Sequence, residues 1–195
     1  MLPSRDAAGS RLLLPVLILH LAALAAALGP LVFFGAAVAP AASRVLPTRD
    51  LAAELTSPIL SQACLAAEAA FAALFATSWF LTRRETPPYT RVLMTRAPVL
   101  GFFAVLVVRQ LLIPPIDKIR EEAPGLIDSL PAGDPSRILL DRYHRLATGF
   151  FTAAILAAAA VLVVTARLLA ARRREPAPPA ASRPPVPKIL DLGDV

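Results

Sequence analysis

Four long apolar runs, separated by charged or proline-rich segments, dominate the chain. The runs cover residues 12–42, 63–81, 97–113 and 146–171. A helix needs about 20 mostly apolar residues to cross the ~30 Å hydrocarbon core of a bilayer. The pattern therefore predicts an all-α membrane protein, a four-transmembrane-helix bundle with spans at about 12–38, 63–81, 97–113 and 146–171.

Glycine and proline residues predict where these helices bend or end. The first run is longer than the hydrocarbon requires, so we expect a tilt or kink near Gly29 and Pro30 and then an irregular piece up to Pro40. Residues 50–62 place leucine or isoleucine at every fourth position, which predicts a short interfacial helix that breaks or ends near Pro58.

The third and fourth helices are expected to reach beyond the apolar runs on one side. Proline favours helix starts and stops, so the third span is expected to begin at Pro98 and to close at residues 114–115. Before the fourth run, Asp134 is a predicted N-cap and Pro135 a predicted first helical residue. Residues 116–145 are thus predicted to form an extracytoplasmic helical hairpin extension.

The distribution of basic residues predicts the orientation. Twelve of the 20 Lys and Arg residues lie near the two termini or between the second and third spans, seven lie on the opposite side with most of the acids, and Arg109 lies inside a span. The positive-inside rule places residues 1–11 and a proline-rich, disordered tail of residues 172–195 in the cytoplasm, around a membrane domain of residues 12–171. A cleaved signal peptide is the alternative for the first run, although that run is about twice the usual length.

Composition agrees with this assignment. The chain is 56% hydrophobic and 17% charged, more apolar than a soluble domain of 195 residues. The net charge of +6 is explained by orientation, so no nucleic-acid partner is expected. The single cysteine, Cys64, excludes an intrachain disulfide.

Few residues are candidates for chemistry. No nucleotide-binding, metalloprotease, hydrolase or redox motif is present, so we expect no enzyme, no catalytic residue and no cofactor. Glu68 and Arg109, with Gln110 beside the arginine, are ionisable or polar residues inside predicted spans. Their predicted depths match, which favours an ion pair that fixes helix packing; a polar transport path is the alternative.

The two histidines invite a metal or haem interpretation. His20 is predicted to lie about 12 Å inside the first span, whereas His144 is predicted to lie just outside the opposite face. One iron could not reach both, so the sequence favours a packed polar residue and a surface histidine, and no metal site.

Several segments together resemble one known family. These are the first-span sequence FFGAAVAP, the following RVLP, the third-span end LLIPPIDKIR and the fourth-helix start DPSRILLDRYHRL. The chain resembles the bacterial domain of unknown function 4149 family, which is related to the transmembrane protein 205 group. The resemblance implies a four-span membrane protein, and it carries over to His144 with Arg142 and Tyr143; where it implies a serine one turn later, this chain has Ala147 and then Thr148.

Three functions follow from these observations. The leading expectation is a non-enzymatic helical bundle of the bacterial plasma (inner) membrane, with an accessory or envelope role. Its partners would be the lipid bilayer and either another membrane protein or a second copy. The alternatives are a small transporter or channel-like element that uses Glu68 and Arg109, and a metal or haem binder related to copper-resistance proteins.

Overall fold

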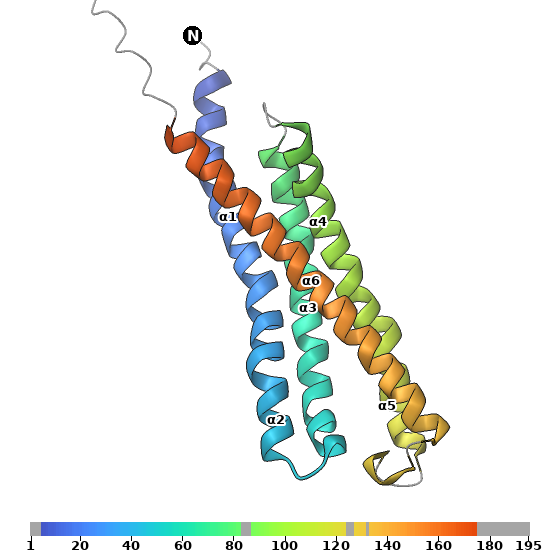
Figure 1. The fold of residues 1–195 in the computed structure, drawn as a ribbon. Coiled ribbons are helices and arrows are strands. Elements are labelled where there is room, and N and C mark those ends of the chain that lie inside the picture. Colours follow the sequence, from blue (N-terminus) through green and yellow to red (C-terminus); the bar gives the residue numbers. More distant parts are fainter. Residues whose placement is uncertain (1–4, 83–86, 124–126, 132, 175–195) are drawn as a thin grey trace, which may run out of the picture.

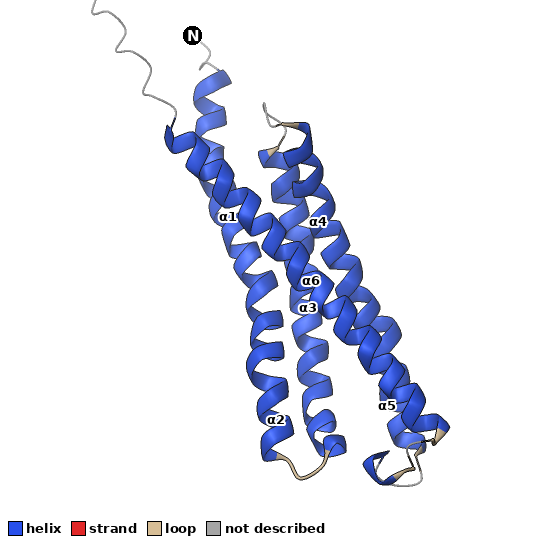
Figure 2. Ribbon diagram, in the orientation of Figure 1, coloured by secondary structure: helices blue, strands red, loops and turns tan. Residues whose placement is uncertain are grey.

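The computed structural model describes residues 5–82, 87–123, 127–131 and 133–174. Helices form the regular structure, and these residues include no strand (Figure 2). In chain order the elements are α1 (Arg5–Phe33), η1 (Phe34–Val38), α2 (Ala39–Val45), α3 (Arg49–Leu81), α4 (Pro88–Val107), η2 (Val108–Leu112), α5 (Ile113–Glu122), η3 (Ile127–Ser129) and α6 (Pro135–Arg174). The predicted tail of residues 172–195 lies almost wholly outside the described residues.

Consecutive elements join into four rods that are long and apolar enough to cross a membrane. These rods are Leu13–Val45, Arg49–Leu81, Pro88–Glu122 and Pro135–Ala171. The all-helical class with four such helices is therefore confirmed. Large apolar side chains such as Leu100, Leu111 and Leu156 remain exposed on the outside of the rods, as expected for surfaces that face lipid.

The four rods have two distinct ends (Figure 1). The start of α1, the end of α3, the start of α4 and the end of α6 lie at what we call the terminal end, and the end of α2, the start of α3, the end of α5 and the start of α6 lie at the opposite, loop end. α3 packs between α1 and α4, and α6 crosses obliquely over α1 and α4 (Figure 1). At the loop end α6 runs beside α5, away from α2.

The prolines do not end the helices where the sequence predicted. α3 continues through Pro58, and α4 begins ten residues before Pro98 and continues through it, so both predictions are wrong. The predicted stop at residues 114–115 is also wrong, because they are the second and third residues of α5, which follows η2 directly and continues the rod to Glu122. Interior prolines are tolerated in apolar rods because neighbouring helices and local changes of helix type satisfy the freed carbonyls.

Two π-helical segments interrupt the α-helical rods. The segment η1 joins α1 to α2, and the backbone N–H of Ala39 donates to the carbonyl of Phe34, five residues earlier. The segment η2 joins α4 to α5 in the same way, through Ile113 and Val108. The irregular piece expected after Pro30 is thus a wide helical turn, and the helix continues on both sides of it.

The predicted start of the fourth helix is confirmed. Asp134 caps α6, because its carboxylate accepts a hydrogen bond of 2.8 Å from the backbone N–H of Ser136. Asp50, at the start of α3, accepts a 2.7 Å bond from the backbone N–H of Ile127 and so fixes the α5–α6 connection against α3. These two bonds cap the start of α6 and join η3 to the start of α3.

The core is narrow because small residues line it. Ala27, Ala67, Ala154 and Ala158 are fully buried where the rods approach one another. Small side chains allow membrane helices to come close and to pack through dispersion contacts. Phe71 is the largest fully buried side chain, and its ring fills the space left by Gly101 on α4.

Candidate functional site

Glu68 and Arg109 meet between α3 and η2. The Arg109 Nε donates to one carboxylate oxygen of Glu68 at 2.7 Å, and its Nη2 donates to the other oxygen at 2.8 Å. The Glu68 side chain is 9% exposed, and the Arg109 side chain is 24% exposed. Such a two-point contact between planar groups is the strongest ion-pair geometry available to arginine.

The position of Arg109 within η2 explains why this contact forms. Gln110, the next residue, is exposed on the outside of the rod, and Val108, the preceding residue, is fully buried. Arg109 therefore stands at the edge between the core and the outer surface, with its guanidinium directed to α3. Both carboxylate oxygens of Glu68 are occupied, so the pair is internally satisfied.

His20 connects three rods in the half of the bundle nearer the terminal end. Its ring is fully buried; Nδ1 lies 2.9 Å from the hydroxyl of Thr77 on α3, and Nε2 lies 3.0 Å from the hydroxyl of Thr165 on α6. The same Thr165 hydroxyl lies 3.8 Å from the sulfur of Met94 on α4. His20 is thus a packed polar residue whose two ring nitrogens are both used.

The hydroxyl directions assign the tautomer of His20. The Thr77 hydroxyl lies 2.9 Å from Nδ1, 2.8 Å from the carbonyl of Ala73 and 3.1 Å from the carbonyl of Leu74. When its single proton goes to one of the carbonyls, its oxygen accepts from the histidine, and in that arrangement Nδ1 carries the ring proton. In a neutral ring Nε2 is then an acceptor, so the single proton of the Thr165 hydroxyl goes to Nε2 and not to the sulfur of Met94, its other acceptor.

We expect nitrogen-15 NMR of the ring to show a protonated Nδ1 and an unprotonated Nε2 on His20. Thr77→Val should destabilise the protein by about 1 to 3 kcal/mol, because it strands a buried donor while preserving shape. The exposed ring of His144 serves as the reference signal in the same spectrum. A proton on Nε2 with a bare Nδ1 would contradict the assignment.

His144 lies far from His20. Thr165, which contacts His20, is 21 residues from His144 along α6, so the two rings are separated by roughly 30 Å of helix. Of the positions carried over from the family resemblance, Arg142 is exposed and Tyr143 packs against the core. The hydroxyl of Thr148 donates to the backbone carbonyl of His144, at 2.9 Å, so it is not bonded to the imidazole.

The loop end contains a cleft that the sequence did not predict. Three cavities of about 600, 640 and 290 Å³ are lined there by α2, α3, α5 and α6, and they meet around the side chain of Arg120, which lines all three. These volumes fall in the range of roughly 300 to 1,000 Å³ that is usual for small-molecule sites. We call the cavities the acidic cavity, the mouth and the inner cavity, respectively.

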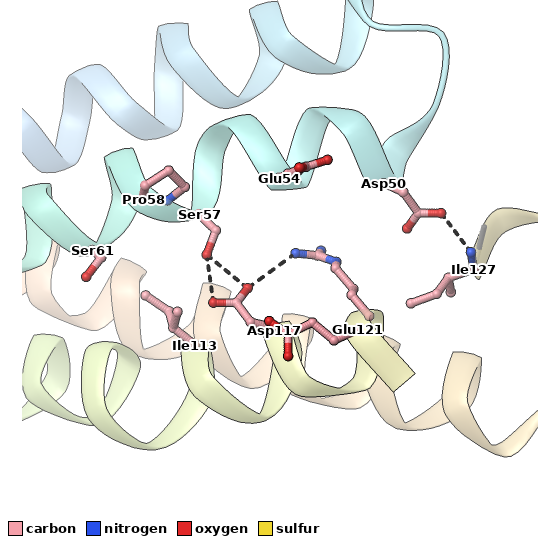
Figure 3. A pocket seen from close by; sticks show the side chains of 10 residues that line it. Asp50, Glu54, Ser57, Pro58, Ser61, Ile113, Asp117, Glu121 and Ile127 are labelled. Carbon is pink, nitrogen blue, oxygen red and sulfur yellow. Dashed lines mark hydrogen bonds and ion pairs between the residues drawn. The ribbon is translucent and has the colours of Figure 1, made fainter. Parts of the chain in front are cut away.

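The acidic cavity lies between α3 and α5 (Figure 3). Asp117 points from α5 toward α3, where the Ser57 hydroxyl donates to both of its carboxylate oxygens at 3.0 and 3.1 Å. Arg120 lies 3.8 Å from the same carboxylate, which is a long ion-pair distance. The remaining acidic lining residues are Asp50, Glu54 and Glu121.

The mouth opens between α2 and α6. Its α2 wall includes Pro40 and Ser43, and its α6 wall includes Arg137, Asp141 and His144. Arg137 is partly committed, because its Nη1 donates to the carbonyl of Leu130 at 2.8 Å. The mouth therefore combines charges of both signs on flexible side chains.

The inner cavity is mainly apolar and lies deeper in the bundle. The rings of Phe34 and Phe151 meet edge to face at 5.9 Å and close the gap between the first rod and α6. A Cβ at Gly35 would lie 3.4 Å from the Phe151 ring, which is close to ordinary van der Waals contact. Val108 and Ile113, on either side of η2's arginine, line the opposite wall.

Among the described residues, the sequence identified the Glu68–Arg109 contact but missed the partners of His20 and the whole cleft. One signal was present for Arg120. It lies four residues after Ile116 and seven after Ile113, so it shares the buried face of α5. A basic residue that continues an apolar face is unusual enough to have been singled out.

No family model matches the chain, and no curated protein or solved structure matches it.

Proposed function

We propose that the chain is a non-enzymatic multi-pass membrane protein that binds a small molecule in the cleft at its loop end and serves an accessory or envelope role. One observation carries this proposal: three cavities of ligand size meet at one arginine, next to a core of packed alanine and larger apolar side chains. The four apolar rods support insertion in a bilayer.

The proposed orientation follows from charge. The terminal end carries most of the basic residues and the loop end most of the acids, so the terminal end is cytoplasmic in a bacterial plasma membrane and the cleft opens on the outer side. The resemblance to the domain of unknown function 4149 family supports the same four-span arrangement and adds no activity. In this orientation the α5–α6 hairpin is extracytoplasmic.

The ion pair is assigned a structural role. A transport path through Glu68 and Arg109 would need the groups to exchange partners with a solute or water. In the observed contact each carboxylate oxygen already accepts a short charge-assisted hydrogen bond. The pair therefore holds α3 against η2 beneath the cleft.

Thiol labelling tests the orientation and the accessibility of the cleft together. In a Cys64→Ala background, Thr56→Cys places a thiol on the α3 wall that is shared by the mouth and the inner cavity, and Tyr89→Cys places one on the exposed start of α4. A membrane-impermeant maleimide should label Thr56→Cys in intact spheroplasts. It should label Tyr89→Cys only in inverted vesicles.

The native thiol provides the buried control. Cys64 is fully buried, so wild-type protein should react only after denaturation. If folded Thr56→Cys, purified in neutral detergent without added lipid, is as unreactive as Cys64, the cleft is closed and the proposed binding function is wrong. Labelling of Thr56→Cys only in inverted vesicles would reverse the orientation.

A further inference from the structure

We infer that the ligand of the cleft is an amphiphile with a phosphate headgroup, a phospholipid of net negative charge from the leaflet at the loop end. This inference rests on the proposed function, since it names the chemical class that the proposed site would take. Three observations support it: the polarity gradient along the cleft, the state of Arg120, and the distribution of charge around it.

The cleft changes from apolar to polar along its length. The inner cavity is lined mainly by aromatic and aliphatic side chains, including Phe34, Leu60 and Phe151. The mouth also has apolar walls, and it adds arginine, aspartate and serine side chains to them. A fully polar ligand would place polar groups against the apolar walls of the inner cavity, where they find no hydrogen-bond partners. A purely apolar ligand would cover the charged side chains of the mouth without pairing them. A molecule with an apolar chain and a charged head fits both parts.

Arg120 supplies the positive charge at the junction. Among the described residues that line the inner cavity, Arg120 is the only arginine or lysine, and none is an aspartate or glutamate. Its Nε is buried and has no hydrogen-bond partner within the described part of the chain, and its contact with Asp117 is 3.8 Å, against 2.7 Å for Arg109 with Glu68. Arg120 thus retains donor capacity for a phosphate oxygen, the acceptor that a guanidinium binds in a two-point geometry.

The surrounding charges direct an anion toward the mouth. On the α3–α5 side the acidic cavity repels a phosphate through its four carboxylates. On the α2–α6 side the mouth is lined by three arginines, Arg49, Arg120 and Arg137, against two acids, and one of these acids, Asp50, also lines the acidic cavity. The headgroup therefore sits between Arg120 and α6, with its chains in the inner cavity or between α2 and α6.

The opening of the cleft suits a ligand that arrives from the bilayer. α6 packs against α1, α4 and α5, and at the loop end it diverges from α2 (Figure 1). The gap between α2 and α6 is the mouth, and large exposed apolar residues such as Val45 and Leu139 lie on these two helices. Basic pockets between membrane helices are established recognition sites for anionic headgroups.

Thermal unfolding in a neutral detergent tests the inference on the full chain. We expect dioleoyl phosphatidylglycerol to raise the Tm in a saturable manner, and we expect dioleoylglycerol, which lacks the phosphate, and glycerol phosphate, which lacks the chains, to have no such effect. Arg120→Gln should weaken the apparent affinity for phosphatidylglycerol about tenfold, because one charge-assisted contact is lost. Arg142→Gln is the matched control, since that arginine is exposed on α6 and is not among the residues that line the three cavities.

A second variant separates binding from folding. Arg120→Lys retains the charge but not the two-point geometry, so it should bind more weakly than wild type and more tightly than Arg120→Gln. Equal shifts with phosphatidylcholine would overturn the assignment of a net negative headgroup. A shift with glycerol phosphate alone would overturn the amphiphile in favour of a soluble phosphate.

The failures of the two proposals can be told apart. If Thr56→Cys is labelled from outside but phosphatidylglycerol neither raises the Tm nor slows labelling, the amphiphile is wrong and the open cleft stands. Native mass spectrometry can detect a dimer of the chain. If dimer formation protects Thr56→Cys from labelling and phosphatidylglycerol does not, the occupant of the cleft is a second copy and the inference is overturned. A Thr56→Cys that stays unreactive in neutral detergent without added lipid defeats both proposals.

Discussion

Alanine at Gly101 is expected to destabilise the bundle by about 3 kcal/mol, through overpacking against a fully buried ring. A Cβ at this position would overlap the edge of the Phe71 ring, including a distance of 2.8 Å to Cδ1. Phe71 is fully buried between α3 and α4, so the ring has no adjacent space into which it can move. Thermal unfolding in detergent, with helicity followed by circular dichroism, measures the loss.

The chain contains a matched glycine for comparison. Gly149 lies within α6, and a Cβ there would meet nothing within 4 Å, so Gly149→Ala should be neutral or should stabilise by up to about 1 kcal/mol. Phe71→Leu should reduce the cost of Gly101→Ala, because the smaller side chain leaves room for the methyl group. If Gly101→Ala costs the same with and without the Phe71→Leu change, the two positions do not compete for the same space.

Removal of either partner of the ion pair is expected to cost about 1 to 3 kcal/mol. Glu68→Ala leaves the guanidinium without its acceptor, although Arg109 lies at the edge of the rod and can extend toward polar surroundings. Arg109→Ala leaves the more deeply buried carboxylate unpaired, and it can respond by taking a proton. The double variant should cost less than the sum of the two, because neither charge is stranded.

Two comparisons define this experiment. The charge swap Glu68→Arg with Arg109→Glu should recover part of the loss in Tm relative to the single variants. Glu122→Gln removes an exposed pair with Lys118 on α5, at 3.7 Å, and should change stability by less than about 0.5 kcal/mol. Additive single losses with no recovery by the swap would mean that the contact contributes nothing to stability.

The sequence was sufficient to predict the helices, because crossing a bilayer imposes a length and a composition on each one. It was also sufficient for the Glu68–Arg109 contact. Charged residues are rare inside apolar runs, and the rise per residue placed these two at the same depth. Both predictions need only the number of residues between two positions on a helix, and this number can be counted in the sequence.

Helix boundaries at proline were predicted less well. Pro58 and Pro98 would end isolated helices, yet each is inside a rod of more than 30 residues that packs against its neighbours. Tertiary contacts outweighed the local preference, as they do for most helix propensities. The apolar runs that contain these prolines were therefore predicted correctly, but the helix ends predicted at the prolines were wrong.

The cleft was missed because it depends on how the rods diverge. The residues around it come from α2, α3, α5 and α6, and their juxtaposition follows from the oblique crossing of α6. The partners of His20 were missed for a related reason: Thr77 and Thr165 are 57 and 145 residues from it. Threonine in an apolar helix can satisfy its hydroxyl within its own turn, so neither residue indicated a distant partner.

The π-helical segment η2 determines how one rod uses two arginines. Arg109 and Arg120 are eleven residues apart, a spacing that places two side chains within about 20° of one another on an uninterrupted α-helix. The extra residue in a π turn changes this alignment, because three of the five residues of η2 follow Arg109 and precede α5. A helical wheel drawn through Pro88–Glu122 would therefore superimpose the two guanidiniums, whereas in the folded chain one faces Glu68 and the other continues the face of Ile113 and Ile116 into the cleft.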